Sequence, residues 1–261
     1  MFGKLKTLLR KRSDGGVEQS QPFDAPLAPD EPFVAIGDVH GCIDPLNRVL
    51  DRISNEYDPR IPLVFLGDLI DRGPHSAAVI ELAYTLSQNT ARNVVCLMGN
   101  HERMLLDFID DPIGRGLRWL PNGGTEALQS YGLQVSSAGL DVEDALDLSR
   151  EFETKIPQEH LAWLRGLPLM WTSGNVACVH AAMDPAKPVT AQDRRVLQWG
   201  TRAFFSTPRD DGIWAVHGHT IVRAPSINGG RIAVDTGAYQ TGRLTAAMID
   251  TDRCEFLSSE G

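Results

Sequence analysis

A strand-like apolar run that stops at two acids and an arginine constrains this chain most. Residues 63–66 read Leu-Val-Phe-Leu, Gly67 ends the run, and Asp68, Asp71 and Arg72 follow directly. Burying charged groups is costly unless they are paired or bind an ion, so stability alone explains such a strand end poorly. We therefore interpret this stretch as the floor of an active site.

Composition narrows the class of protein. With 261 residues, of which 42% are hydrophobic, the chain can bury the core of one large domain. It has no apolar run near the ~18 residues that a membrane-spanning helix needs. The formal charge of −9 gives no support for nucleic-acid binding, so we expect no nucleic-acid partner. The same acidity disfavours a phosphate site unless divalent cations neutralise its carboxylates.

The cysteines and the N-terminus bear on location. Four scattered cysteines, with no Cys-x-x-Cys spacing, argue against a disulfide framework and a cysteine zinc site. We expect reduced thiols and a cytoplasmic protein without a signal peptide. Residues 1–12 combine basic side chains with three leucines, which fits either a mobile tail or weak surface contact with anionic lipid, but no stable membrane insertion. With the proline-containing linker 17–32 they form a flexible segment, 1–32.

The folded domain is predicted to span residues 33–261 and to begin with three strand, polar loop and helix units. Such units predict an α/β domain whose loops gather at the carboxyl edge of the strands. An insert at about 103–172 has helical spacing and is expected to lie over the site. The predicted strands are 33–36, 63–66, 93–98, 175–179, 212–216, 231–234 and 244–249, the last closing the sheet, and the first helices are 45–53 and 76–86.

Five strand ends carry groups that bind metals. A pair of divalent ions needs imidazole and carboxylate ligands on each ion and one carboxylate that bridges them. Taken singly, a Gly-Asp turn or a lone histidine is common without any ion, but together these residues predict a dinuclear site. Asp38 and His40 suit the first ion, Asn100, His180 and His219 suit the second, and Asp68 suits the bridge. The loop motifs of nucleotide-binding, dinucleotide-binding and serine-hydrolase proteins are absent from the sequence.

These strand-end motifs resemble the signature of a known family. The matching segments are Gly37–Gly41, Gly67–Gly73, Gly99–Glu102, His180–Ala181 and His217–Thr220. Together they are similar to the metallophosphoesterases and, within them, to the serine/threonine phosphoprotein phosphatases of the PPP type from bacteria and phage. The resemblance implies two packed mixed β-sheets flanked by helices, a four-layer sandwich with a helical insert. It also implies the metal ligands given above.

The resemblance further implies roles for the remaining residues. His101 would donate a proton to the leaving group, oriented by Asp71, while a hydroxide bridging the two metals attacks phosphorus. Arg72, Arg202 and Asn100 would bind the substrate phosphate, with Arg194 and Arg195 as competitors of Arg202. Two neighbours of the site are expected to be structural, His217 behind the metal ligands and Glu102 as a hydrogen-bond partner. Residues 119–124 resemble an insert segment of bacterial relatives, although a plain glycine turn is an alternative.

The main functional hypothesis is a serine/threonine phosphoprotein phosphatase that acts on phosphoproteins or small phosphoesters. The alternative is a symmetrical dinucleoside tetraphosphatase, and Asp71 followed by Arg72 is taken to favour the phosphatase. A phosphoprotein-binding scaffold without turnover is a third hypothesis, although no expected ligand is missing. Two divalent ions are expected, with manganese preferred and iron or zinc as options. The sequence makes no prediction of the physiological substrate or the oligomeric state.

Overall fold

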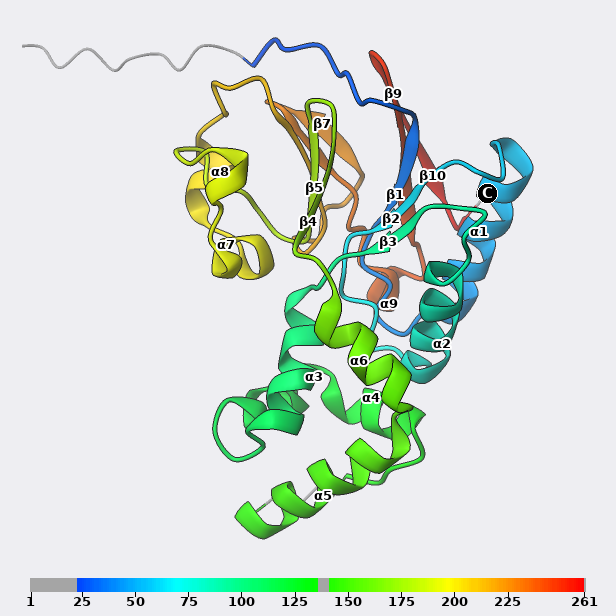
Figure 1. Ribbon diagram of the computed structural model, residues 1–261, viewed down its shortest axis with the longest axis vertical. Helices are drawn as coiled ribbons and strands as arrows, with labels where there is room; N and C mark the ends of the chain where they lie inside the picture. The colour runs from blue at the N-terminus through cyan, green and yellow to red at the C-terminus, as the bar shows by residue number, and fades with distance from the viewer. Residues whose placement is uncertain (1–22, 136–140, 261) are drawn as a thin grey trace, which may run out of the picture.

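Two five-stranded sheets form the centre of the computed structural model, which describes residues 23–135 and 141–260 (Figure 1). The first sheet has the order β10-β9-β1-β2-β3 and the second the order β4-β5-β6-β8-β7. Their strands are β1 Phe33–Ile36, β2 Leu63–Phe65, β3 Val94–Cys96, β9 Thr245–Asp250, β10 Arg253–Ser258, β4 Met170–Ser173, β5 Val176–Val179, β6 Trp214–His217, β7 Ser226–Asn228 and β8 Arg231–Ala233. Both sheets are mixed, as predicted.

The central strands are apolar on both faces because each sheet is covered on both sides. In β1, Phe33 and Ala35 join the core between the sheets, whereas Val34 and Ile36 pack under helices. The side chains of β5 alternate in the same way between the inter-sheet core and the opposite face. Each fully buried large side chain contributes about 1.5–3 kcal/mol of hydrophobic stabilisation.

Helices cover the outer faces of the two sheets and complete the four layers. Helices α1 (Ile43–Glu56) and α2 (Ser76–Ser87) pack on the first sheet, and α7 (Arg194–Trp199) and α8 (Arg202–Ser206) on the second. The region of the predicted insert contains α3 (Asn100–Asp110), α4 (Gly124–Ser130), α5 (Val142–Lys155) and α6 (Gln158–Gly166), together with short 3-10 turns at Arg115–Arg118 and Leu120–Asn122. These helices lie at one end of the molecule, beside α2 (Figure 1). None of the helices in the described ranges is long and apolar enough to cross a membrane.

Parallel pairing sets the position of the site. Strands β1, β2 and β3 run parallel, and so do β5, β6 and β8. The carboxyl ends of parallel strands lie at the same edge of a sheet, so the loops that follow them converge. The two sheets also meet there, because the ring of His180, after β5 of the second sheet, bonds to the carbonyl of Leu66, after β2 of the first sheet.

The edges of the sheets differ from the prediction. Strand β9 does not close its sheet, since β10 pairs with it along its full length at the edge. Strands β4 and β7 were also not predicted, and both are antiparallel edge strands. Edge strands carry a weak sequence signal because one side faces solvent and their apolar alternation is incomplete. In β7 all three residues are exposed.

Part of the expected linker packs on the sheets. Leu27 is buried in the inter-sheet core, and Asn175 donates to the carbonyl of Pro26 and accepts from the N–H of Ala28. The indole of Trp214 donates to the carbonyl of Ala25 at 3.1 Å. Residues 25–28 are therefore attached to the second sheet. Residues 1–22, including the basic segment 1–12, lie outside the described part of the chain.

Candidate active site

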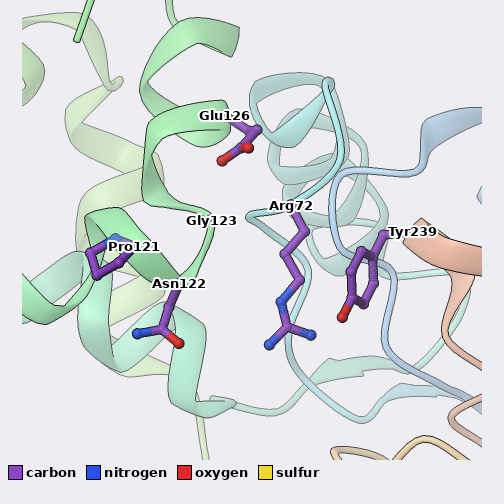
Figure 2. A pocket seen from close by; sticks show the side chains of 6 residues that line it. All are labelled: Arg72, Pro121, Asn122, Gly123, Glu126 and Tyr239. Carbon is purple, nitrogen blue, oxygen red and sulfur yellow. The ribbon is translucent and has the colours of Figure 1, made fainter. Parts of the chain in front are cut away.

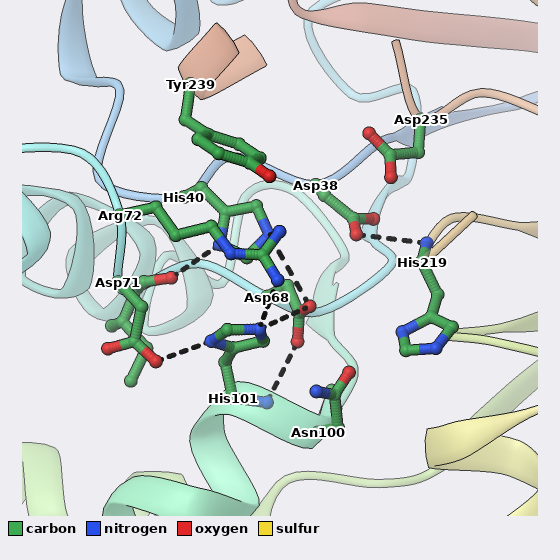
Figure 3. Close-up of polar contacts among 12 residues, drawn as sticks. Asp38, His40, Asp68, Asp71, Arg72, Asn100, His101, His219, Asp235 and Tyr239 are labelled. Carbon is green, nitrogen blue, oxygen red and sulfur yellow. Dashed lines mark hydrogen bonds and ion pairs between the residues drawn. The ribbon is translucent and has the colours of Figure 1, made fainter. Parts of the chain in front are cut away.

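The polar residues predicted from the strand ends gather where the two sheets meet (Figure 3). Three loops of the first sheet and two of the second supply them. Asp38 and His40 follow β1, Asp68, Asp71 and Arg72 follow β2, Asn100 and His101 begin α3, His180 follows β5, and His219 follows β6. All of these except Arg72 and His219 are buried, and those two are half-buried.

The backbone at these residues is strained. His40, Asp68, Asp71, Arg72 and His219 all have positive φ angles, between 47° and 75°. Residues other than glycine rarely adopt this left-handed conformation, and each such residue costs of order 1–3 kcal/mol. Strain of this kind persists where the surrounding structure fixes a side chain for function.

Two groups of possible metal ligands share one carboxylate. The first contains His40, Asp68 and His101, and the second contains Asp68, His180 and His219, with the potential ligand atoms in each group within 4.8 Å of one another. Asp68 Oδ2 lies 3.6 Å from His40 Nε2, and Asp68 Oδ1 lies 3.4 Å from His180 Nε2. A carboxylate that presents one oxygen to each group is placed to bridge two cations.

Two histidines are held with one ring nitrogen towards this carboxylate. His40 Nδ1 lies 2.8 Å from the carbonyl of Ile70, and His180 Nδ1 lies 2.9 Å from the carbonyl of Leu66. These bonds place a proton on Nδ1 of each ring, so Nε2 is the nitrogen that is turned towards Asp68. The same arrangement is typical of histidines that bind metal, because the second bond fixes the tautomer and the ring orientation.

The second group also includes the predicted amide ligand. Asn100 Oδ1 lies 2.9 Å from His180 Nε2, which is 3.2 Å from His219 Nδ1. Burial lowers the pKa of His219 to about 4, and of His40 to about 3, so both rings are neutral and retain a lone pair for a ligand bond.

Asp38 lies beside the two groups but in neither of them. Its Oδ2 accepts from the backbone N–H of His219, while its buried Oδ1 has no hydrogen-bond donor among the described residues. Burial raises the pKa of Asp38 well above its ordinary value, and the neighbouring Asp235 and Asp68 raise it further. A buried acidic cluster with an unpaired oxygen is stabilised when a cation binds, so the residues present fit a metal centre.

Two glycines allow the carboxylates to approach the backbone. A Cβ on Gly99 would collide with Asp68 Oδ1, and a Cβ on Gly218 would collide with Asp38 Oδ1. To make room, Asp68 would have to leave the two groups of ligands that share it, and Asp38 would lose its bond from the N–H of His219. Both positions therefore require glycine for steric reasons.

A hydrogen-bonded chain supports His101. Its Nδ1 lies 2.5 Å from Asp71 Oδ2, and the indole N–H of Trp119 donates to the two carboxylate oxygens at 2.8 and 3.0 Å. Asp71 and Trp119 are fully buried. Burial raises the pKa of Asp71 to about 6, although the bonds from His101 and Trp119 oppose the rise. The pKa of His101 is also raised, because Asp68 and Asp71 outweigh the effect of its own burial.

Arg72 extends over the histidines from the half-buried side. Its guanidinium lies 3.1 Å from His40 Nε2 and 3.1 Å from His101 Nε2, and its Cζ is 4.7 Å from the centre of the Tyr239 ring. A cation on His40 Nε2 would use the lone pair that now faces Arg72.

Other predicted residues lie further from the centre. Arg202 is exposed at the start of α8, and its side chain has no hydrogen-bond or ion-pair partner among the described residues. Arg194 and Arg195 are also exposed, on α7. His217 is buried and contacts the rings of Phe204 and Phe205 rather than either group of possible metal ligands.

Glu102 has a structural role. Its carboxylate accepts backbone N–H groups from Asp68, Leu69 and Gly99 at 2.8–2.9 Å. The last of these bonds joins Glu102 to the N–H of Gly99, the N-cap residue of α3, and so caps the start of this helix. One side chain thus joins the loops after β2 and β3, in agreement with the structural role expected from the sequence.

Three residues of the site are not predicted from the sequence. Asp235 follows β8, so the strand-end rule that identifies the other acids applies to it as well. In the sequence, Trp119 belongs to residues 119–124, which resemble an insert segment of bacterial relatives or form a plain glycine turn, and nothing indicates Tyr239. Neither carries a sequence signal, because their roles depend on contacts with Asp71 and Arg72 at distant positions.

Comparison with known proteins agrees with this geometry. The family model described as calcineurin-like phosphoesterase matches residues 31–223. The asymmetrical bis(5′-nucleosyl)-tetraphosphatase PrpE of Halalkalibacterium halodurans is 30% identical over 254 residues, which cover 87% of this chain and 92% of that protein. The protein of the same name from Oceanobacillus iheyensis is 28% identical over 235 residues, covering 81% of this chain and 86% of its own.

A solved structure shares the fold. The crystal structure of a protein provisionally named a diadenosine tetraphosphatase superposes with a TM-score of 0.62 at 21% identity, covering 90% of this chain and 98% of its own. The two-sheet architecture, the shared carboxylate between two donor groups and the matching family model lead to the same conclusion. The chain belongs to the calcineurin-like phosphoesterase family.

Proposed function

We propose that this chain is a metal-dependent hydrolase of dinucleoside tetraphosphates. The observation that carries this proposal is the match to two asymmetrical bis(5′-nucleosyl)-tetraphosphatases, which extends over 81–87% of this chain and 86–92% of theirs. The match therefore extends well beyond the metal motifs. The comparisons favour this substrate class over the phosphoprotein substrate expected from the sequence.

The metal ligands remain those proposed from the sequence. Asp38, His40 and Asp68 would hold one divalent ion, and Asp68, Asn100, His180 and His219 would hold the other. When bound, such ions polarise phosphoryl oxygens and lower the pKa of coordinated water. Manganese remains the proposed metal. A cytoplasmic location also remains part of the proposal, and the four unpaired cysteines are consistent with it.

The chain's own residues would act on the two ends of the scissile bond. Arg72 can bind phosphate oxygens through its planar fork of N–H donors, which matches phosphate geometry. His101 would donate its proton to the leaving oxygen as the bond to phosphorus breaks. Asp71 would fix the His101 ring and favour its protonated form, since Asp71 Oδ2 lies 2.5 Å from His101 Nδ1. We propose no phosphate contact for Arg202 beyond the expectation from the sequence.

Hydrolysis of phosphoserine and phosphothreonine is the second candidate. The same metal ligands, Arg72 and His101 would serve that reaction, because a phosphomonoester presents the same phosphoryl group. The Asp71-Arg72-Gly73 motif, which resembles that of the phosphoprotein phosphatases, supports it. A scaffold without turnover is less well supported, since none of the groups needed for chemistry is missing from the cluster (Figure 3).

A substrate panel tests the proposal. Purified protein with manganese would be assayed with a dinucleoside tetraphosphate, a phosphopeptide and p-nitrophenyl phosphate, each with and without a chelator. The proposal predicts the highest kcat/KM for the dinucleotide, and loss of all turnover with the chelator. A higher kcat/KM for the phosphopeptide would replace it with the second candidate, and no turnover of any substrate would favour the scaffold.

A further inference from the structure

An open cavity lies between Arg72 and the start of α4. Its volume is about 340 Å³, and Arg72, Pro121, Asn122, Gly123, Glu126 and Tyr239 line it. Figure 2 shows the Arg72 side chain between Tyr239 on one side and the Asn122 segment on the other. The cavity therefore begins at the residue that faces the proposed metal ligands.

The two ends of this cavity differ in charge. The guanidinium of Arg72 is directed away from Glu126, whose carboxylate lies towards the main-chain end of the Arg72 side chain (Figure 2). No ion pair between the two appears among the described residues, so each remains available to a ligand. A guanidinium attracts phosphate, whereas a carboxylate repels phosphate and accepts hydrogen bonds from hydroxyl or amino groups.

The remaining lining suits a flat, partly apolar group. Tyr239 lines the cavity with an aromatic ring, one face of which the Arg72 guanidinium covers, so a base would contact the part of the ring that Arg72 leaves open. Contact of a base with an aromatic side chain tolerates any base. Asn122 uses its amide nitrogen on the carbonyl of Arg118 at 2.7 Å, while its Oδ1 has no donor among the described residues. An acceptor at this position suits an amino group on a base.

We propose that this cavity binds one nucleoside of the substrate, with its own phosphate at Arg72 and its ribose or base at Glu126 and Tyr239. This inference deepens the proposed function and rests on it. The volume lies near the lower end of the roughly 300–1,000 Å³ typical of small-molecule sites, so the cavity suits one nucleoside rather than two. The second nucleoside and the remaining phosphates extend past the metal ligands.

The position of the nucleoside determines which bond is cut. Since the cavity directly adjoins Arg72, the phosphate that Arg72 holds is the one attached to the bound nucleoside, its α-phosphate, and this phosphate is the reacting centre. The oxygen of water bonds to the α-phosphorus, and the bond from that phosphorus to its bridging oxygen breaks. The bridging oxygen leaves on a nucleoside triphosphate and takes a proton from His101. A proton of the attacking water then restores the proton of His101. The products are one nucleoside monophosphate and one triphosphate, an asymmetrical cut in line with the names of the two tetraphosphatase relatives, and the new element is the placement of the nucleoside that would produce it.

Ligand binding tests the cavity without the dinucleotide. The manganese-loaded full chain would be assayed for hydrolysis of p-nitrophenyl phosphate in the presence of AMP, ribose phosphate or inorganic phosphate as inhibitor. Binding of AMP would also be measured by calorimetry. We expect AMP to bind at least tenfold more tightly than phosphate. Glu126→Ala and Tyr239→Ala should each reduce this preference at least fivefold, and Tyr239→Phe should retain it. Equal binding of AMP and phosphate by the wild type would overturn the inference.

A matched control separates recognition from general damage. Glu143 is also an acidic residue in the first helical turn, at the start of α5 and outside the cavity. Glu143→Ala should leave the preference for AMP over phosphate unchanged. A variant that weakens the binding of both ligands equally likewise keeps this preference, so such a loss reflects general damage. If Glu126→Ala weakens AMP and phosphate to the same extent, Glu126 does not contact the nucleoside.

Product analysis tests the position of the cut. Chromatography of the products from bis(adenosyl) tetraphosphate should give AMP and ATP in equal amounts, and two molecules of ADP would refute the proposed placement. If the wild type does not hydrolyse this substrate but still prefers AMP over phosphate, the proposed function fails while the nucleoside cavity stands. The two failures are thus distinguishable.

Discussion

The contact between Trp119 and Asp71 predicts a change in the pH dependence of activity. Trp119→Phe keeps an aromatic ring in the buried site but removes the N–H that donates to both oxygens of Asp71 at 2.8 and 3.0 Å. A hydrogen bond to a charged group contributes about 1.5–3 kcal/mol. At 1.36 kcal/mol per unit, its loss should raise the pKa of Asp71 by roughly one to two units.

The consequence for activity follows from the ionised fraction of Asp71. From a pKa of about 6, the variant should reach roughly 7–8. If Asp71 must be ionised to support His101, activity at about pH 7 should fall roughly two- to tenfold and recover as the pH rises to about 9.

The free energy of unfolding also depends on the ionisation of Asp71. The folded state holds this proton more tightly than the unfolded state, so stability falls as pH rises from the ordinary pKa of 3.8 to about 6, and over a wider range in the variant.

The assay is kcat/KM against pH for wild type and Trp119→Phe. Trp163→Phe is the matched control, because Trp163 packs against Tyr84 at the edge of the same core and contacts neither Asp71 nor His101. The control should keep the wild-type profile. Two results would refute the proposed role of Trp119. One is a Trp119→Phe profile that coincides with that of the wild type, and the other is an equal loss of activity at every pH.

Three further predictions follow from the same cluster. Asp68→Asn should reduce turnover at least a hundredfold and weaken metal retention after dialysis, measured by elemental analysis, whereas full activity would contradict a bridging role. His101→Asn should retain its metal and lose roughly 10²–10⁴-fold in turnover of substrates with poor leaving groups, with a smaller loss for p-nitrophenyl phosphate; equal losses for both would exclude a proton donor. Removal of metal with a chelator should lower the melting temperature by several degrees, since an ion bound only by the folded state stabilises it, and an unchanged value would contradict binding at these buried acids.

The fold and most of the cluster follow from local features of the sequence. A buried parallel strand needs an apolar run, and its end needs a turn, so acids and histidines directly after such runs converge at one edge. This reasoning identifies Asp38, Asp68 and His180 from the sequence alone. It does not identify β10, because Arg253 and Glu255 alternate with half-buried residues and give an edge strand a polar composition.

Contacts between distant segments are not predictable in this way. Trp119 reaches Asp71 across 48 positions, from a turn whose sequence indicates only glycine-rich irregularity. The positive φ angles at His40 and Asp68 are likewise imposed by the surrounding loops, against the local preference of those residues. Sequence reasoning therefore finds the residues that can bind metal but not those that orient or strain them.

The burial of Asp71 explains why it is a poor guide to the substrate. Its side chain is fully buried, with one face on His101 and the other on Trp119, so it touches no group that distinguishes a phosphopeptide from a nucleotide. In its proposed role, Asp71 would support proton donation by His101 to any leaving oxygen. Substrate choice must instead depend on side chains that are accessible beside the reacting phosphate. Glu126 and Tyr239 in the cavity at Arg72 meet that condition, so they, and not the acid of the Asp-Arg-Gly motif, should separate the two functions.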